Sequence, residues 1–239
     1  MRRLGIIGGT GPESTISYYR AIIHGVQEAL GEDRLPPLTI ESLSVFDVFD
    51  YCSRQDYDGL TDYLVTAVER LARAGVDVDS LTALTPHIVF DRLQAASPIP
   101  LISAVEATRD AAVEQKVARL ALLGTEYTMT QDFFACSLRD AGIEVALPNS
   151  TEIDYIQDRI ARELEAGIVT ESTRDGFTAI IRRLRDEEGS ERVILGCTEL
   201  PLLLNDDNSP LPCLDTVEIH TRALVAAITV SPTVRRESL

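Results

Sequence analysis

The chain has 239 residues, of which 25% are charged and 45% hydrophobic, so it can bury one large α/β core or two smaller ones. Its formal net charge of -16 argues against nucleic acid or an anionic membrane surface as a partner. No apolar run reaches the roughly 18 residues that a membrane span needs, whereas a small anionic ligand stays possible because helix N-termini bind anions even in acidic proteins.

The first residues are basic and then apolar, as in a signal peptide, but the apolar run stops after Ile7 at a glycine cluster. We therefore predict a first strand over residues 4–7 and a cytoplasmic protein. A helix is expected over 13–30 and a second strand over 36–44. Residues 59–75 place apolar side chains on one face of a helix that stops at Gly75.

Strands and helices continue to alternate along the rest of the chain. A strand is expected before Ala83, followed by a helix through Arg92. The later strands are predicted over 99–103, 120–124 and 192–196, and the later helices over 129–141, 154–166, 171–185 and 215–228. This alternation predicts an α/β fold with parallel sheets and crossover connections.

Two stretches of the chain resemble each other. Residues 4–22 and 120–138 both read as an apolar strand, a Gly-Thr pair, a hydroxyl-bearing turn and a helix with paired aromatic residues. Gly9 corresponds to Gly124, and Ala83 to Cys197, at nearly one offset of about 115 residues. We therefore predict two similar three-layer α/β half-domains related by a pseudo-two-fold axis, with the active site in the cleft between them. The predicted halves are 1–100 plus 215–239, and 101–214.

Four turns follow predicted strands and are rich in Gly, Ser and Thr: "GGTGPEST", "ALTPH", "GTEYTMT" and "GCTEL". In parallel sheets the ligand lies beyond the carboxyl ends of the strands. Free N–H groups and hydroxyls there suit a small carboxylate or phosphate. Any one turn is explained equally well by Ser and Thr capping a helix, but four together favour an anion site.

A nucleotide site is less well supported. Gly5, Gly8 and Gly11, with Glu41 after the second strand, do not have the G-x-G-x-x-G spacing, and no phosphate-binding lysine follows. A serine hydrolase is also disfavoured, because the chain has no G-x-S-x-G elbow.

Cys197 is the strongest candidate for chemistry, because it follows a predicted strand and begins a predicted helix whose dipole would favour a thiolate. The alternative is a buried structural cysteine. Cys52, Cys136 and Cys213 lack such a context and are predicted to be structural. His87 and His220 are predicted to orient or cap rather than to move protons. The scattered cysteines suggest neither a metal site nor a disulfide framework.

Taken together, "LGIIGGTGPEST" with "YYR", "LLGTEYTM", "LGCTELPLLL" and "LPCLDTVEIH" resembles the cofactor-independent aspartate/glutamate racemase family over nearly the whole chain. The resemblance implies a duplicated α/β fold, often in a homodimer, that needs neither pyridoxal phosphate nor metal. It also implies two cysteines on opposite sides of the α-carbon of a small carboxylate substrate. One cysteine takes the proton and the other returns one to the opposite face.

The resemblance assigns roles to individual residues. Cys197 matches the second catalytic cysteine, and Thr85 matches the hydroxyl that holds the substrate carboxylate. The other residues that it assigns to substrate binding are Gly9, Thr10, Ser14, Thr125, Thr128, Thr198 and Glu199.

The chain departs from the family pattern at Ala83-Leu84-Thr85, where the family usually has Cys-Asn-Thr or a Ser/Thr-Asn-Thr variant. Ala83 cannot move a proton, and Leu84 replaces a polar ligand group by an apolar wall. One hypothesis is therefore an amino-acid racemase-type isomerase that acts on a small carboxylate such as aspartate or glutamate, or a derivative of such an enzyme with Cys197 as its single base. A second is a single-cysteine lyase of the arylmalonate decarboxylase type, and a third is a non-catalytic carboxylate-binding protein.

Overall fold

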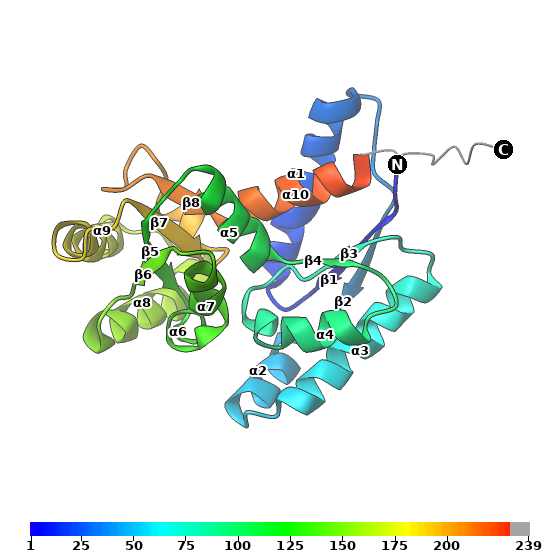
Figure 1. Ribbon diagram of the computed structural model, residues 1–239, viewed down its shortest axis with the longest axis horizontal. Helices are drawn as coiled ribbons and strands as arrows, with labels where there is room; N and C mark the ends of the chain where they lie inside the picture. Colours follow the sequence, from blue (N-terminus) through cyan, green and yellow to red (C-terminus); the bar gives the residue numbers. More distant parts are fainter. Residues whose placement is uncertain (230–239) are drawn as a thin grey trace. The chain divides into compact units, whose positions relative to one another are not determined.

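The computed structural model describes residues 1–229, which form two compact units (Figure 1). Unit 1 consists of residues 1–82 and 91–102 and the described residues from Thr221 on; unit 2 consists of 83–90 and 103–220. The halves predicted from the sequence, 1–100 plus 215–239 and 101–214, stay a prediction. Residues 230–239 of the first half lie outside the described residues.

Unit 1 is built from strands and helices in alternation. Its elements are β1 (Leu4–Gly8), α1 (Pro12–Leu30), β2 (Leu38–Ser42), α2 (Val45–Ser53), α3 (Tyr57–Arg73), β3 (Asp79–Ser80), α4 (Phe90–Ala96), β4 (Leu101–Ile102) and most of the last helix, α10 (Thr216–Thr229).

Unit 2 follows the same plan with more irregular connections. Its elements are the 3-10 helix η1 (Thr85–Val89), α5 (Ala104–Glu114), β5 (Arg119–Gly124), α6 (Glu126–Thr130), α7 (Asp132–Asp140), β6 (Glu144–Ala146), α8 (Ser150–Arg162), η2 (Leu164–Ala166), α9 (Glu171–Asp186), β7 (Arg192–Gly196), η3 (Leu200–Leu202) and β8 (Cys213–Asp215).

Every strand pair among the described residues is parallel, as predicted. In unit 1, β1 pairs with β2, β3 pairs with β4, and two isolated bridges join Leu4 to Val78 and Ile7 to Leu81. The order in space is therefore β2-β1-β3-β4. Unit 2 has the order β6-β5-β7-β8. Each unit thus places its second strand beside its first and then adds the third and fourth, which is what an internal duplication would leave.

The sheet of unit 2 is buried on both faces. Successive residues of a strand point to opposite faces, so Ala121 and Leu123 of β5 join a cluster with α8 and α9. Leu120 and Leu122 join a second cluster with α5 and α7. This three-layer arrangement explains why β5 and β7 read as continuous apolar runs rather than as alternating patterns.

In unit 1, α1 lies beside α10 (Figure 1), and a Cβ on Gly25 would lie 2.9 Å from a methyl carbon of Val225. The predicted apolar face of α3 is buried, with Leu60, Leu64 and Ala67 fully shielded from solvent. Strand pairing places β1 between β2 and β3, with its carboxyl end at Gly8.

Two predicted helices differ from their expected bounds, and one helix was not predicted. The helix expected over 129–141 is two helices, α6 and α7, because Gln131 between them is extended (φ -88, ψ 142). The helix expected from 154 begins at Ser150, because Asn149 and Glu152 form a capping box. Helix α2 was not predicted; Ser44 caps it by accepting a hydrogen bond from the N–H of Asp47.

Four other elements were also not predicted from the sequence: α4 as a helix separate from η1, α5, β6 and β8. The two strands have only three residues each, and such short runs carry little periodic signal.

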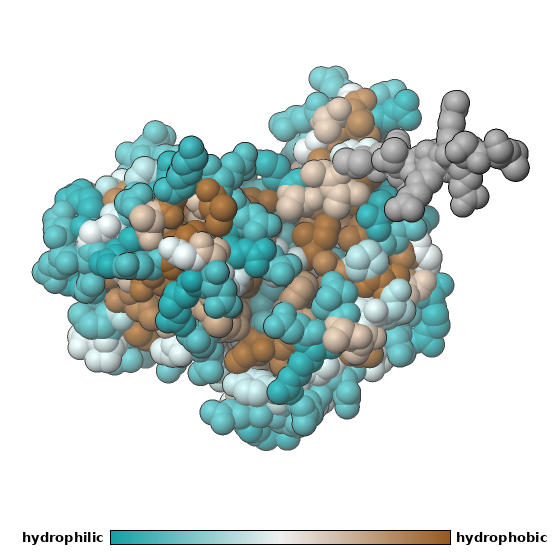
Figure 2. All heavy atoms as spheres, viewed as in Figure 1, coloured by the Kyte–Doolittle hydropathy of each residue, from teal (hydrophilic) through white to brown (hydrophobic). Residues whose placement is uncertain are grey.

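Hydrophilic side chains cover most of the face shown in Figure 2, with hydrophobic side chains gathered in small groups. Among residues 1–229, no helix combines the length and the apolar character needed to cross a membrane.

Asp79 is an unusual core residue of unit 1. It is fully buried on β3, where Oδ1 accepts a hydrogen bond of 2.7 Å from the N–H of Ser80 and Oδ2 has no partner. A Cβ on Gly5 of β1 would lie 2.9 Å from Oδ1, so glycine makes room for the carboxyl group. Burial raises the pKa of Asp79 from 3.8 to about 7, although the Ser80 N–H opposes this.

We expect Asp79→Asn to change how stability depends on pH. The folded-state pKa lies above the unfolded one, so the native protein loses stability as the pH rises from about 3.8 to about 7. The unfolding free energy of Asp79→Asn minus that of the native protein should rise by about 4 kcal/mol between pH 4 and pH 8. Urea unfolding at both pH values measures this shift. Asp62→Asn, at an exposed position of α3, is the control; an equal shift there would contradict the prediction.

Candidate active site

Two glycine turns of unit 2 lie side by side at the carboxyl edge of its sheet. Gly124 ends β5 and Gly196 ends β7, and the two residues are partners in the parallel register. A Cβ on Gly124 would lie 2.5 Å from the carbonyl oxygen of Gly196, and one on Gly196 would lie 2.6 Å from that of Leu123. Only glycine allows this close approach, so the turn that carries Cys197 is adjacent to the turn that carries Thr125.

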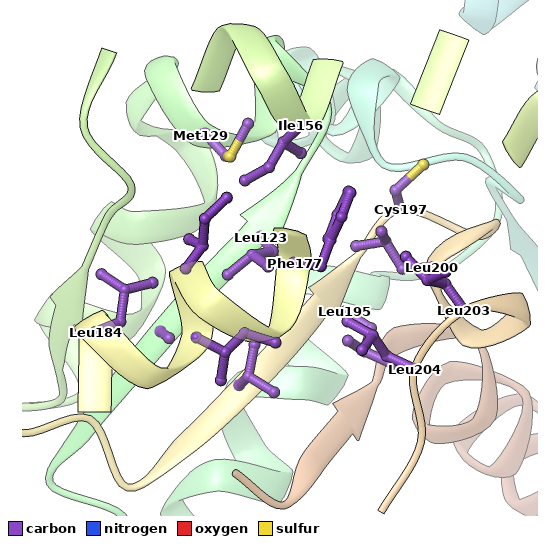
Figure 3. Packing of buried hydrophobic residues seen from close by; sticks show 14 of the residues in the cluster. Leu123, Met129, Ile156, Phe177, Leu184, Leu195, Cys197, Leu200, Leu203 and Leu204 are labelled. Atoms are coloured by element: carbon purple, nitrogen blue, oxygen red, sulfur yellow. The ribbon is translucent and has the colours of Figure 1, made fainter. Parts of the chain in front are cut away.

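The thiol of Cys197 follows the carboxyl end of β7 and is 7% exposed. Its Sγ donates a hydrogen bond of 3.0 Å to Oε2 of Glu199, and the hydroxyl of Thr198 donates one of 2.8 Å to the same oxygen. Figure 3 shows Cys197 at the edge of the hydrophobic cluster, with its sulfur directed away from Leu195 and Leu204.

The electrostatic surroundings of this thiol differ from the sequence-based expectation. Burial and the negative charges of Glu199 and Glu165 raise the pKa of Cys197 well above its ordinary value of 9.0. The resting thiol is therefore protonated rather than ionised. The expected helix dipole is absent, because Cys197 is followed by a turn and by the three-residue 3-10 helix Leu200–Leu202 instead of an α-helix.

The two threonines of the neighbouring turn are bonded to each other. Thr125 caps the short helix α6, with its Oγ1 accepting from the N–H of Thr128 at 3.4 Å, and the two hydroxyl oxygens are 3.1 Å apart. Thr128 is 1% exposed and borders both Gly124 and Gly196. The structure thus brings Thr125, Thr128, Cys197, Thr198 and Glu199 to one edge of one sheet; their binding roles stay predictions.

Ala83 begins the segment that belongs to unit 2 and is held there by His87. His87 is 4% exposed, and its Nε2 accepts a hydrogen bond of 3.1 Å from the N–H of Ala104. The proton therefore resides on Nδ1, which donates to the carbonyl of Ala83 at 3.0 Å. Burial lowers the pKa of His87 from 6.5 to about 4, so the ring is neutral. The predicted orienting role thus has a geometric basis: His87 ties the Ala83 turn to the start of α5.

We expect His87→Gln to remove a loss of stability at acid pH. A folded-state pKa below the unfolded value means that the native protein loses about 3 kcal/mol as the pH falls from about 6.5 to about 4. Over this pH range the titrations of His87 and Asp79 change the stability in opposite directions. The unfolding free energy of each variant is therefore compared with that of the native protein at the same pH. Urea unfolding at pH 7.5 and pH 3.5 measures it. The exposed His24→Gln is the control. If the unfolding free energy of His87→Gln falls with acid pH as steeply as that of the native protein, His87 does not titrate in this range.

The segment around Ala83 offers less apolar surface than the sequence suggested. Leu84 is 7% exposed and belongs to the core cluster that contains Ala104 and Leu122. Thr85, which is half-buried, begins η1 rather than an α-helix. The expected apolar wall from Leu84 is thus largely absorbed by the core of unit 2.

The predicted ligand residues of unit 1 occupy the turn after β1. Gly9 has φ +78, its N–H donates to Oγ1 of Thr15 at 2.9 Å, and a Cβ there would lie 2.2 Å from the carbonyl of Leu43. Ser14 is 3% exposed, and its hydroxyl donates to the carbonyl of Thr82 at 2.6 Å. Its proton is therefore committed within the unit. Thr10 is half-buried in the same turn.

The other three cysteines and His220 are not among the residues of the candidate site. All four cysteines are free thiols, with Cys52 buried, Cys136 exposed and Cys213 half-buried. His220 is fully buried. The described part of the chain contains no group of three or more His, Cys, Asp or Glu side chains placed to hold a metal ion.

Sequence reasoning did not identify Glu165. Its charge raises the pKa of Cys197, and burial together with the charge of Glu199 raises the pKa of Glu165 itself. Glu165 lies in η2, 32 positions before the thiol, and nothing in the local sequence marks it. Only the folding of unit 2 brings the carboxyl groups of Glu165 and Glu199 and the thiol of Cys197 close enough to interact electrostatically.

A protonated thiol that donates to a carboxylate, at the end of a strand of a parallel sheet, has the properties of a proton donor and acceptor for a bound carbon acid. The chain thus has a two-unit α/β fold with parallel strands, and its candidate site holds a thiol and a carboxylate in hydrogen-bond contact.

Comparison with known proteins identifies the family. The Asp/Glu/Hydantoin racemase family model matches residues 7–224. The broad-specificity amino-acid racemase RacX of Bacillus subtilis (strain 168) is 26% identical over 229 residues, which cover 93% of this chain and 96% of that protein.

Two solved structures are similar over nearly their whole length. An Asp/Glu racemase candidate from Yersinia pestis is 34% identical with a TM-score of 0.89, covering 95% of this chain and 99% of that one. An aspartate racemase homologue from Pyrococcus horikoshii OT3 is 35% identical with a TM-score of 0.86, covering 96% and 100%. The chain therefore belongs to the Asp/Glu/hydantoin racemase family, which places it among the isomerases.

Proposed function

We propose that this chain is a cofactor-independent, racemase-type isomerase that moves the α-proton of an amino acid through a single thiol, that of Cys197. Family membership and the similarity to an amino-acid racemase support the reaction class. The observation that carries the proposal is the 3.0 Å hydrogen bond from Sγ of Cys197 to Glu199, which gives the thiol proton an acceptor.

The proposed cycle uses only groups of this chain. Glu199 takes the proton of Cys197, and the thiolate then removes the α-proton of the bound amino acid. The resulting enolate-like charge is stabilised by hydroxyls and N–H groups of the neighbouring turns, such as those of Thr85, Thr125 and Thr198. Reprotonation by Cys197 returns a proton to the same face, because Ala83 offers no donor for the other.

The experiment that tests this proposal is α-proton exchange in deuterated water, followed by nuclear magnetic resonance over a panel of amino acids. The proposal predicts that at least one amino acid gains deuterium at the α-carbon without added pyridoxal phosphate or metal. Absence of exchange across the whole panel would contradict it.

A lyase is the second candidate, and the protonated state of Cys197 favours it. A protonated thiol can deliver its proton directly to an enolate that forms when a substituted malonate loses carbon dioxide. Release of carbon dioxide from such malonates, without exchange on amino acids, would support the lyase. Carboxylate binding that survives loss of Cys197, with no turnover, would instead indicate a binding protein.

We further propose that the working form is a cytoplasmic homodimer, in which the dimer is what the family resemblance implies. Light scattering coupled to gel filtration measures the mass, and a mass near that of one 26.2 kDa chain would contradict the dimer.

A further inference from the structure

The carboxylate of Glu199 accepts two hydrogen bonds on one oxygen. Sγ of Cys197 donates to Oε2 at 3.0 Å, and the hydroxyl of Thr198 donates to the same Oε2 at 2.8 Å. A threonine hydroxyl carries a single proton. In the resting site that proton is therefore directed at Glu199, although the family resemblance assigns Thr198 to substrate binding.

The two donors differ in strength. A thiol is a weak hydrogen-bond donor, whereas a hydroxyl that donates to a carboxylate forms one of the stronger hydrogen bonds in proteins. The bond from Thr198 is thus the one that can hold the carboxylate in place. The bond from Cys197 depends on where the carboxylate is held.

Other contacts in the turn fix the backbone of Glu199 but not its carboxylate. The N–H of Leu202 donates to the Glu199 carbonyl at 3.1 Å, and the N–H of Leu200 donates to the Cys197 carbonyl at 3.1 Å. In the part of the chain that the structure describes, no ion pair involves the carboxylate of Glu199. A glutamate side chain loses much rotamer freedom when it is fixed. Without the Thr198 hydroxyl, the half-buried Glu199 would be free to turn away from the thiol.

The bond from Thr198 also fits the proposed cycle. When Glu199 takes the thiol proton, its carboxyl group becomes neutral and is a weaker acceptor than the carboxylate. The Thr198 hydroxyl is then available for the enolate-like charge. It returns to Glu199 when the proton goes back to the sulfur.

We propose that Thr198 is a positioning residue, whose hydroxyl holds Oε2 of Glu199 against the thiol of Cys197. It acts through Glu199 and does not set the affinity for the substrate. The kinetic consequence of this inference rests on the proposed function, which it deepens; the positioning itself does not.

Raman spectroscopy of the S–H stretching band tests the positioning without any substrate, because a hydrogen bond lowers the frequency of this band. The band of Cys197 is the spectrum of each protein minus that of the same protein carrying Cys197→Ala. Glu199→Ala gives the band of this thiol without its acceptor.

We expect Thr198→Val, which has a similar shape but no hydroxyl, to move the band from its native position toward that of Glu199→Ala. Thr198→Ser keeps the hydroxyl and should leave the band near its native position. A band that stays at its native position in Thr198→Val would overturn the inference.

The kinetics of α-deuterium exchange test the consequence for the reaction. Thr198→Val should lower kcat by roughly tenfold or more, because a hydrogen bond to a charged group is lost, and should change KM little. Thr198→Ser should recover most of kcat. A raised KM with an unchanged kcat would show that Thr198 holds the substrate instead, and would overturn the inference.

Thr151→Val is the matched control. It makes the same substitution at an exposed position of α8 in unit 2, and should leave both the S–H band and the exchange unchanged. The urea midpoint of each variant shows whether it is folded. Absence of exchange with every amino acid would overturn the proposed function, and the S–H band would still decide whether Thr198 positions Glu199.

Discussion

The Cys197→Ala variant should lose α-proton exchange by about 10²- to 10⁴-fold or more, because a positioned general acid–base group contributes about that much. The thiol is the group that we expect to contact the α-carbon. Its Sγ donates a hydrogen bond of 3.0 Å to Oε2 of Glu199, and the hydroxyl of Thr198 donates one of 2.8 Å to the same oxygen. Exchange is measured by the loss of the α-proton signal in deuterated water.

Cys136→Ala is the control for this experiment, because it removes an exposed thiol elsewhere in unit 2. It should leave exchange unchanged. Since Cys197 is 7% exposed at the edge of a core cluster, unfolding of the variant must be ruled out by its urea midpoint. Exchange that persists in a folded Cys197→Ala protein would show that another group removes the proton.

The Ala83→Cys variant should gain racemisation by about 10²- to 10⁴-fold relative to the native protein, because it supplies the donor that the opposite face lacks. The half-buried side chain of Ala83 leaves room at the start of the turn, and His87 holds that turn through the Ala83 carbonyl, which the substitution does not alter. Chiral chromatography of the product over time measures the gain.

Ala83→Ser is the matched control, because it adds a side chain of similar size whose hydroxyl is a much weaker acid than a thiol. It should racemise far more slowly than Ala83→Cys. A native protein that already racemises as fast as Ala83→Cys would mean that position 83 does not provide the missing donor.

The sheet strands that carry the turns could be predicted because they are buried on both faces. Residues 120–124 and 192–196 are continuous apolar runs that end in glycine, and both are strands of the parallel sheet. Helix α2 is harder to predict, because it depends on the Ser44 cap rather than on a long apolar pattern.

The candidate site was predicted only in part. The sequence indicated the position of Cys197 but predicted a thiolate, on the assumption that an α-helix follows. The structure has a 3-10 turn there and two nearby carboxylates, so the pKa of the thiol is raised. The influence of Glu165 comes from tertiary packing across 32 positions and has no local signature.

The hydroxyls illustrate the same limit. The ligand roles of Ser14 and Thr125 stay predictions; in the structure Ser14 also donates to the Thr82 carbonyl and Thr125 also caps α6. Hydroxyl-rich turns serve both purposes, and the sequence cannot separate them because capping and ligand binding use the same residue types.

The most direct test of the central claim, that one thiol works on one face of the α-carbon, is to follow deuterium incorporation and optical rotation together in the native protein. An enantiopure amino acid found by the panel is incubated in deuterated water. The account predicts that deuterium enters the α-position while the rotation stays nearly constant. A rotation that decays as fast as deuterium enters would contradict it, because the protein would then exchange protons on both faces without a second thiol.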